Sequence, residues 1–359
     1  MSNILQNRPT LRTFISKAAI NRSRAEKIHR MFYQNGPGYG TFLGLPFDQL
    51  VEHGPGHEFK WERSARPEAV IELANKGNFS SLVLSVGQAQ KYQHDIDPKI
   101  PLMVKLDGHF YTGKANDINY PRHTMFGSVE DAIRVGATAV GLTFYLGSED
   151  IGNDIERIAE VRDEAHRFGL PLVLWSYPRG PLPDTTQANS LLWCHYAVSS
   201  AESLGADIVK TKYPSVVEPG KREAYDNFIM KEYIKKIPEA GRYLELEPKK
   251  EKLLEYEKGM KAKGEKPNYD SLLTYEQHVE RTKIVIGAGE RTLVIFSGGS
   301  KVKGDASKAV TESTKIIMDA GGEGRIIGRN FWGIPIKEAL QMLETVTKVM
   351  QKEEYRRKF

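Results

Sequence analysis

The segment LGADIVKTKYP, residues 204–214, is typical of a buried β-strand, yet it contains two lysines. Side chains two positions apart on a strand point to the same side, so Lys210 and Lys212 share one face. Two ammonium groups on a core strand need an explanation, because a charge is costly to bury without a partner. The neighbouring strands determine what these groups can do.

Seven further segments of the same kind recur along the chain, each short, apolar and rich in β-branched residues. The eight candidate strands lie at residues 42–47, 80–85, 101–108, 137–146, 170–178, 206–214, 291–299 and 324–329. Segments of helical period lie between most of them, and several end on glycine, as helices often do. This alternation predicts a parallel sheet with helices outside it. Eight units favour an α/β fold of the (β/α)8 TIM-barrel type, and an open doubly wound sheet is the alternative.

Two regions interrupt this alternation. We interpret residues 1–40 as an N-terminal extension with one short helix around residues 22–34. Residues 214–285 separate the sixth and seventh strands by far more than one helix needs. A structureless loop of that length is unusual in a compact domain, so we predict a helical insertion whose many charges form a solvated face. The remainder of residues 41–359 is predicted to form a single TIM-barrel domain.

Composition narrows the class of protein. The 51 basic and 46 acidic residues give a net charge of only +5, which does not indicate a nucleic-acid or membrane-surface partner. Cys194 is the single cysteine, which excludes an intrachain disulfide and a zinc-binding thiol cluster and fits a reducing compartment. No apolar run approaches the roughly 18 residues of a membrane span, and the N-terminus lacks a signal peptide's apolar stretch. We expect a soluble cytoplasmic protein.

Polar side chains gather where the predicted strands end. In a barrel of this type the active site lies at the C-terminal ends of the strands. The strand ends read PFDQLVEHGPG, VKLDGH, LWSYPRG, VKTKYP, FSGGS and IGRNFWG. They bring a carboxylate, lysines, a tyrosine and an arginine to this end of the barrel, which we call its mouth. A barrel needing only stability would end its strands in small or apolar residues.

The lysines of this mouth suit nucleophilic chemistry. A free lysine has a pKa of about 10.4, but desolvation and a neighbouring cation favour the neutral amine. Lys210, with Lys212 beside it and Lys105 from the third strand, meets this requirement. Such an amine attacks a carbonyl to give an iminium, which stabilises a carbanion on the adjacent carbon. The alternative is that the lysines only bind anionic substrate groups.

Aromatic residues accompany the lysines. Trp175 and Tyr177 share one face of the fifth strand, and Arg179 follows. The tyrosine can transfer a proton and the tryptophan can exclude water, although an aromatic pair at this spacing also suits core packing. Asp48 at the end of the first strand can orient a hydroxyl or simply cap a loop. We discount zinc binding by the nearby EHGPGH stretch, because proline and glycine prevent a helical face and no third ligand is obvious.

Two glycine-containing loops predict a phosphate site. SGGS follows the seventh strand and IGRN the eighth, and they offer backbone N–H groups and the guanidinium of Arg329. Barrel enzymes frequently bind phosphate at these two positions.

Six of these motifs, PFDQLVEHGPG, VKLDGH, LWSYPRG, GADIVKTKYP, SGGS and GRNFW, resemble in order the archaeal-type class I fructose-bisphosphate aldolases. The resemblance extends from about residue 40 to residue 345, omitting the insertion. It implies that Lys210 forms the Schiff base, that Tyr177 is the proton donor beside the pocket residue Trp175, and that Asp48 is the aspartate of the first strand. Substrate-contacting positions of the family correspond to Gln49, His53 and Arg179, phosphate-binding positions to Ser297, Gly298, Gly299, Gly328 and Arg329, and a strand-three lysine to Lys105. Relatives usually have glycine where this chain has Leu50, so the loop after the first strand departs from the family.

The resemblance implies reversible cleavage of fructose 1,6-bisphosphate to dihydroxyacetone phosphate and glyceraldehyde 3-phosphate, in glycolysis or gluconeogenesis. Lys212 is then a substrate-binding neighbour, and no metal or cofactor is expected because the iminium replaces a Lewis acid. We also expect a homo-oligomer. Alternatives are a related Schiff-base or transaldolase-like enzyme acting on another sugar phosphate or an aromatic-pathway precursor, a pyridoxal-phosphate enzyme, and a catalytically silent barrel that binds a partner.

Overall fold

The computed structural model describes residues 10–48, 66–108, 123–298 and 305–358 of the chain. Eight parallel strands close into a barrel in the order β1–β10–β9–β8–β7–β6–β3–β2. The strands are β1 (Phe42–Phe47), β2 (Ser81–Ser85), β3 (Leu102–Lys105), β6 (Ala139–Tyr145), β7 (Leu172–Tyr177), β8 (Ile208–Thr211), β9 (Leu293–Ser297) and β10 (Gly324–Ile326). A short antiparallel pair, β4 (Asp107–Gly108) and β5 (Thr124–Met125), follows β3. The predicted barrel is confirmed, since each predicted strand contains one of the eight, and the open sheet is excluded.

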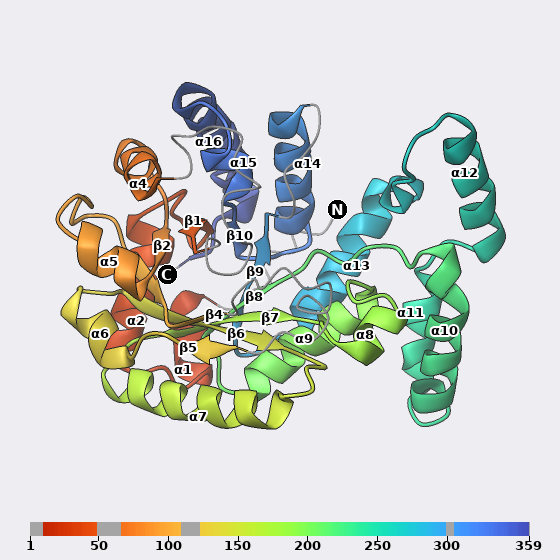
Figure 1. The fold of residues 1–359 in the computed structure, drawn as a ribbon, viewed down its shortest axis with the longest axis horizontal. Helices are drawn as coiled ribbons and strands as arrows, with labels where there is room; N and C mark the ends of the chain where they lie inside the picture. Colours follow the sequence, from red (N-terminus) through yellow and green to blue (C-terminus); the bar gives the residue numbers. More distant parts are fainter. Residues whose placement is uncertain (1–9, 49–65, 109–122, 299–304, 359) are drawn as a thin grey trace.

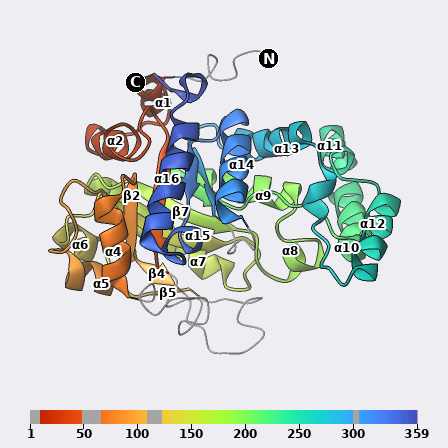
Figure 2. The ribbon, with the colours of Figure 1, turned by 90° about the horizontal axis from the view of Figure 1, so that it is seen from above.

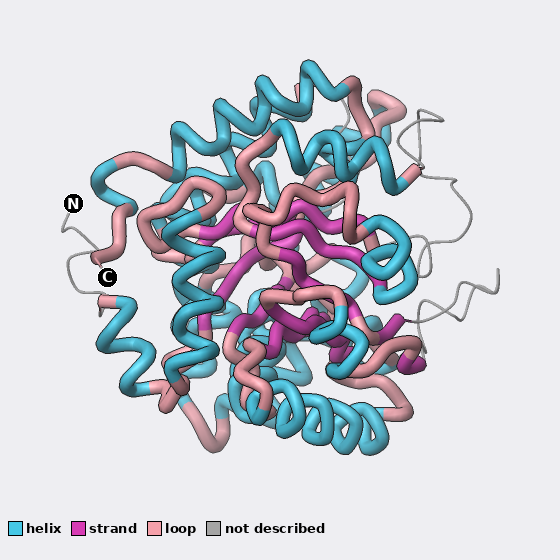
Figure 3. The backbone as a smooth tube through the Cα atoms, turned by 90° about the vertical axis from the view of Figure 1, so that its left-hand side faces the viewer, coloured by secondary structure: helices cyan, strands magenta, loops and turns pink. Residues whose placement is uncertain are grey.

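Helices surround the strands, as Figure 3 shows. They are α4 (Pro67–Lys76), α5 (Val86–Tyr92), α6 (Val129–Arg134), α7 (Ile151–Arg167), α8 (Pro181–Thr185), α9 (Leu191–Ser203), α13 (Tyr275–Gly287), α14 (Ala306–Asp319), α15 (Arg329–Trp332) and α16 (Ile336–Met350). In α16, buried residues recur every three or four positions, namely Ala339, Met342, Leu343, Val346 and Met350. That spacing forms one apolar stripe, which faces the barrel.

The strands alternate between two cores. On β7, Leu172 and Leu174 belong to the larger cluster under the outer helices, whereas Val173 and Trp175 belong to a cluster inside the barrel. Both faces of a strand in this fold are buried, and side chains alternate with a period of two. The near-continuous apolar composition of the predicted strands follows from this double burial.

The N-terminal helices close the bottom of the barrel. α1 (Leu11–Lys17) and α2 (Arg22–His29), continued by the π-helical turn η2 (Arg30–Gln34), contribute apolar residues to the interior cluster. Arg24 Nη1 lies 2.8 Å from Oδ1 of Asp207, just before β8. Figure 2 shows α1 and α2 at one end and β4 and β5 at the opposite end. The helix expected around residues 22–34 is confirmed, and the sequence analysis did not anticipate α1.

The long segment between β8 and β9 is largely helical. It contains α10 (Pro219–Ile229), η5 (Met230–Ile234), η6 (Pro238–Gly241), α11 (Arg242–Glu245), α12 (Lys250–Ala262) and η7 (Tyr269–Leu272). Figures 1 and 2 both place α10, α11 and α12 to one side of the barrel. The predicted helical insertion is confirmed, and in its charged helix α12 the buried residue is Leu253.

A buried ion pair joins this segment to the barrel. Arg281 of α13 lies with Nη1 2.8 Å from Oε1 of Glu247, and its Nη2 donates to the carbonyl of Ser215 at 2.8 Å. Burial raises the pKa of Glu247 above its ordinary value, while Arg281 acts in the opposite direction. α13 itself packs against α9 and α14. It therefore occupies the place of the barrel helix between β8 and β9.

Within these described ranges, no helix is both long and apolar enough to cross a membrane.

Candidate active site

Lys210 lies inside the barrel, on β8, and its side chain is almost fully buried at 7% exposure. Its Cα pairs with that of Trp175 on the neighbouring strand β7. Its Nζ lies 4.8 Å from the centroid of the Trp175 ring and 5.7 Å from that of Tyr177. The structure thus brings together the amine and the two aromatic residues that the sequence analysis selected. The rings form an apolar wall beside the amine, and such a wall excludes water.

Lys212 lies one residue beyond the end of β8 and is half-buried. Its Nζ is 4.9 Å from the centroid of the Tyr177 ring. Tyr177 therefore has the Nζ of each lysine close to its ring, and the two lysines do lie on one face of the strand. The deeper position of Lys210 fits the nucleophile better than the more open position of Lys212.

Asp48 follows directly after β1 and is 9% exposed. In the closed strand order β7 stands opposite β1, so Asp48 and Tyr177 lie at the same end of the barrel on facing strands. Arg179 is half-buried on the loop after β7. Burial raises the pKa of Asp184, and the nearby Arg179 partly offsets that rise. Gln49, His53 and Gly299 fall outside the described residues.

The loops after β9 and β10 meet at the mouth. Ser297 pairs with Ile326, and the Gly298 N–H donates to the Ile326 carbonyl at 2.8 Å. A Cβ on Gly298 would lie 3.0 Å from the Ile327 Cα, a tight contact, so glycine eases this close approach of the two loops. Because the Gly298 N–H already donates to the Ile326 carbonyl, an anion has to be bound by other groups of these loops. Gly328 precedes α15, and the half-buried Arg329 is its first residue.

A buried charge network lies beside this site, and the sequence analysis missed most of it. Asp107 is 1% exposed and sits 2.5 Å from Lys105 Nζ and 2.5 Å from Arg157 Nη1. The backbone N–H of Thr143 donates to both of its carboxylate oxygens, at 2.9 and 3.0 Å. Lys105 Nζ also lies 5.5 Å from the centroid of the Trp175 ring. Lys105, predicted to bind substrate, is thus buried and paired with Asp107.

This network extends through aromatic rings toward Tyr177. His123 Nδ1 lies 3.9 Å from Oδ2 of Asp107, and its ring packs edge-on against Tyr145 with centroids 4.5 Å apart. The Tyr145 and Tyr177 centroids are 6.3 Å apart. The motif VKLDGH contains Lys105 and Asp107 and was the one available signal for this network. The contacts from Arg157 and Tyr145 come from elements more than 30 residues away, which no local pattern reveals.

Replacing Asp107 by asparagine is expected to lower the free energy of unfolding at pH 7 by about 3–5 kcal/mol, because the buried Lys105 and Arg157 each lose an ion pair with this carboxylate. Burial by itself would raise the pKa of Asp107, but Lys105, Arg157 and His123 together hold it below its ordinary value. Its stabilisation is therefore present above the unfolded-state pKa of about 3.9 and is lost as the pH falls through the lower folded-state value.

Urea unfolding measured from pH 7 down to pH 3 checks this prediction. The difference in free energy of unfolding between wild type and Asp107→Asn should begin to decrease below about pH 4. Asp163→Asn is a matched control, because the Asp163 side chain is 73% exposed and pairs with Arg162 at the surface. Loss of this ion pair should lower the free energy of unfolding by at most about 1 kcal/mol. A variant at position 107 as stable as this control would contradict the assignment.

Comparison with known proteins places the chain in a family. The pattern of the DeoC/LacD family aldolases matches residues 42–333. The class 1 fructose-bisphosphate aldolase of Thermoproteus tenax is 37% identical over 190 residues. The match covers 52% of this chain and 66% of the length of that protein, which is just under two thirds. The class 1 fructose-bisphosphate aldolase of Halobacterium salinarum is 27% identical over 296 residues, covering 82% of this chain and 84% of its own length.

A solved structure agrees with these relatives. An archaeal fructose-1,6-bisphosphate aldolase, with its catalytic lysine covalently bound to the carbinolamine intermediate of the substrate, superposes with a TM-score of 0.63. It is 25% identical, and the match covers 90% of this chain and 98% of the other. The family indicated by the sequence motifs is confirmed, and with it the expectation of an aldolase, which is a lyase. The chain belongs to the DeoC/LacD family of aldolases.

Proposed function

We propose that the protein is a class I aldolase that reversibly cleaves fructose 1,6-bisphosphate through a Schiff base on Lys210. The observation that carries this proposal is the buried Lys210 amine, 4.8 Å from the Trp175 ring centroid and 5.7 Å from that of Tyr177. A lysine withdrawn from water is more easily kept as the neutral nucleophile. The class 1 names of the relatives and the carbinolamine on the catalytic lysine of the archaeal structure also support it.

In the proposed reaction the Lys210 amine adds to the C2 ketone to give a carbinolamine, which loses water to form an iminium. Removal of the C4 hydroxyl proton then breaks the C3–C4 bond and releases glyceraldehyde 3-phosphate. The electron pair of that bond moves into the iminium to give an enamine. Protonation of the enamine at C3 and hydrolysis of the resulting iminium release dihydroxyacetone phosphate and restore the free amine.

Tyr177 is the group we assign to proton transfer, at the C4 hydroxyl and at the enamine carbon. Its ring centroid lies 5.7 Å from Lys210 Nζ and 4.9 Å from Lys212 Nζ, close enough for the phenol to reach a substrate attached to Lys210. Asp48, on the facing strand, is proposed to orient a substrate hydroxyl. Trp175 Nε1 is buried and has no hydrogen-bond acceptor among the residues the structure describes, so it is available to a substrate oxygen.

The loops after β9 and β10 are proposed to hold the C1 phosphate through Ser297, Gly328 and Arg329. These residues come to one place because Ser297 pairs directly with Ile326 at the end of β10. A guanidinium and backbone N–H groups together suit a phosphate. We further propose that the enzyme acts in the cytoplasm as a homo-oligomer and serves glycolysis or gluconeogenesis.

A substrate survey tests the proposed function. Purified enzyme is incubated with fructose 1,6-bisphosphate, fructose 1-phosphate and a set of other phosphorylated ketoses, and the products are separated by chromatography. We expect fructose 1,6-bisphosphate to give the highest kcat/KM and the two triose phosphates in equal amounts. A higher kcat/KM for another ketose phosphate would instead identify a related Schiff-base aldolase, and no turnover of any of them would contradict the proposal.

Gly141→Ala is expected to lower kcat/KM by about 100-fold, because displacing a catalytic wall by about 1 Å can cost that much. A Cβ on Gly141 would overlap Cζ3 and Cη2 of the rigid Trp175 ring. The ring must then move toward Lys210 or out of its pocket. Gly152→Ala on α7 is the matched control, because nothing lies within 4 Å of its added Cβ. Equal kinetics for the two variants would show that the position of Trp175 is unimportant.

A further inference from the structure

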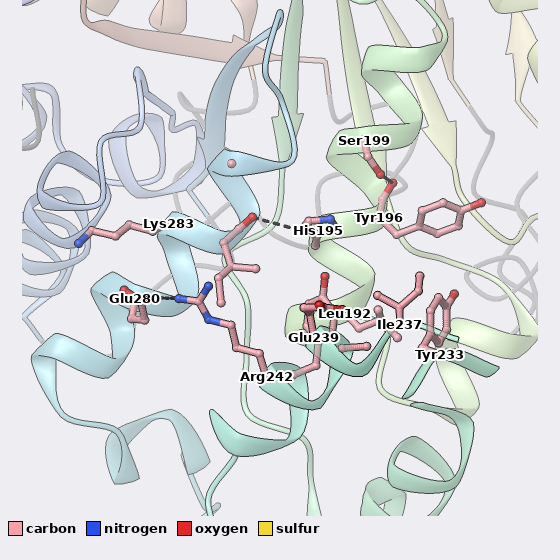
Figure 4. Close-up of a pocket in the computed structure, with 14 residues that line it drawn as sticks. Leu192, His195, Tyr196, Ser199, Tyr233, Ile237, Glu239, Arg242, Glu280 and Lys283 are labelled. Carbon is pink, nitrogen blue, oxygen red and sulfur yellow. Dashed lines mark hydrogen bonds and ion pairs between the residues drawn. The ribbon is translucent and has the colours of Figure 1, made fainter. Parts of the chain in front are cut away.

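A cavity lies on the outside of the barrel, away from the mouth. It has a volume of about 930 Å³ and is lined by residues of α9, α13 and the segment inserted between β8 and β9. Figure 4 shows His195 and Tyr196 of α9 on one wall, Glu280 of α13 on another, and Tyr233 and Arg242 of the insertion closing the space. A volume of this size is typical of sites for small organic ligands.

Four of the residues that line the cavity are aromatic, namely His195, Tyr196, Tyr233 and Tyr243. Burial raises the pKa of Tyr233 and of Tyr243, so both phenols stay protonated and can donate a hydrogen bond. Within the described ranges neither hydroxyl has a hydrogen-bond partner. The cavity therefore offers flat apolar faces together with phenolic donors that a ligand acceptor can satisfy.

His195 supplies the complementary acceptor. Its Nδ1 lies 3.1 Å from the carbonyl oxygen of Ile284, so Nδ1 carries the proton that is donated there. Burial lowers the pKa of His195 despite that hydrogen bond, which keeps the ring neutral. Nε2 then has a lone pair, and no donor to it is found in the described part of the chain. The ring also packs edge-on against Tyr243, with centroids 5.8 Å apart.

The charges of the lining cancel. Arg242 is paired with Glu280, and the two remaining charged side chains, Glu239 and Lys283, are of opposite sign. In Figure 4, Lys283 extends away from His195 and Tyr196. A guanidinium already bound to a carboxylate is a poor receptor for a phosphate, so a sugar bisphosphate does not suit this cavity.

We propose that this cavity is a second binding site, for an uncharged planar heteroaromatic molecule with an N–H donor beside an acceptor atom, the chemistry of a nucleobase or nucleoside. The ring would lie against the tyrosines, its N–H would donate to His195 Nε2, and its acceptor would receive a phenolic hydrogen bond. Such a ligand would bridge α9, which leads into β8, and the insertion. This inference does not depend on the reaction that Lys210 performs.

Isothermal titration calorimetry with adenosine tests the proposal, using the full chain. His195→Asn retains a side-chain N–H for the Ile284 carbonyl but removes the Nε2 acceptor, and Tyr243→Phe removes only a hydroxyl. Each variant should bind adenosine about fivefold or more weakly, the effect of one lost hydrogen bond. Lys210→Met should bind adenosine as the wild type does, which separates this site from the barrel mouth. Retained aldolase activity and an unchanged Tm show that the two pocket variants remain folded.

Three results would overturn the proposal. The first is no binding of adenosine at millimolar concentration. The second is equal binding by wild type, His195→Asn and Tyr243→Phe, or loss of binding in Lys210→Met, because either places adenosine elsewhere. The third is tighter binding of adenosine monophosphate than of adenosine, because it reveals a phosphate subsite and contradicts an uncharged ligand.

Discussion

Replacing Lys210 by methionine is expected to lower kcat for cleavage of fructose 1,6-bisphosphate by about 10⁴-fold or more, because no other group replaces the nucleophile. Methionine keeps an unbranched chain of similar length and suits a site that is only 7% exposed. The loss would therefore reflect the missing amine and not a cavity. Steady-state kinetics with coupled detection of the triose phosphates measures it.

Lys212→Met is the matched control for this change, since both lysines are on one strand face and lie near the Tyr177 ring. Lys212 is predicted to bind substrate, so its loss should raise KM by about 10- to 100-fold and leave most of kcat, as expected for one charged contact. If Lys212→Met were the inactive variant and Lys210→Met the active one, the nucleophile would have been assigned to the wrong lysine.

Tyr177→Phe is expected to lower kcat by about 10²- to 10⁴-fold, the usual contribution of a general acid or base. The ring would remain close to both lysines, because phenylalanine differs only by the hydroxyl. Schiff-base formation on Lys210 should persist, so a covalent adduct accumulates while cleavage slows. Single-turnover kinetics together with mass analysis of the trapped adduct separates the two steps.

Tyr92→Phe serves as the control for removing a hydroxyl, because Tyr92 lies on the outer helix α5 and its hydroxyl donates to the exposed Glu68. It should turn over substrate at the wild-type rate. An unchanged kcat for Tyr177→Phe would show that Tyr177 does not transfer the proton. Failure of this variant to form the adduct would indicate a role for Tyr177 in substrate binding or in the attack of Lys210 on the ketone.

The barrel could be predicted from the sequence because every strand is buried on both faces. Segments such as ATAVGLTFYL, residues 137–146, and LPLVLWSYP, residues 170–178, are apolar at most consecutive positions, and amphipathic helices separate such segments. The closure of the bottom by α1 was not predicted, because a short helix that packs on the end of a barrel carries no distinct pattern. α1 is only seven residues long, and its buried residues are Leu11 and Phe14.

The part of the site that lies on strands could also be predicted, since a barrel places strand ends together. Lys210, Trp175 and Tyr177 are adjacent in space because β7 and β8 are neighbouring strands. The Asp107 network could not be predicted, because Arg157 lies on α7, where it resembles any other polar residue of a helix. The contact between Gly141 and Trp175 depends on ring orientation, which sequence alone does not give.

The most direct test of the account is intact-mass analysis after borohydride reduction in the presence of dihydroxyacetone phosphate. Wild type, Lys210→Met and Lys212→Met are treated in parallel. The account predicts a reduced adduct on the wild type and on Lys212→Met and none on Lys210→Met. No adduct on any of the three, or an adduct that persists on Lys210→Met, would contradict the claim that Lys210 forms the Schiff base.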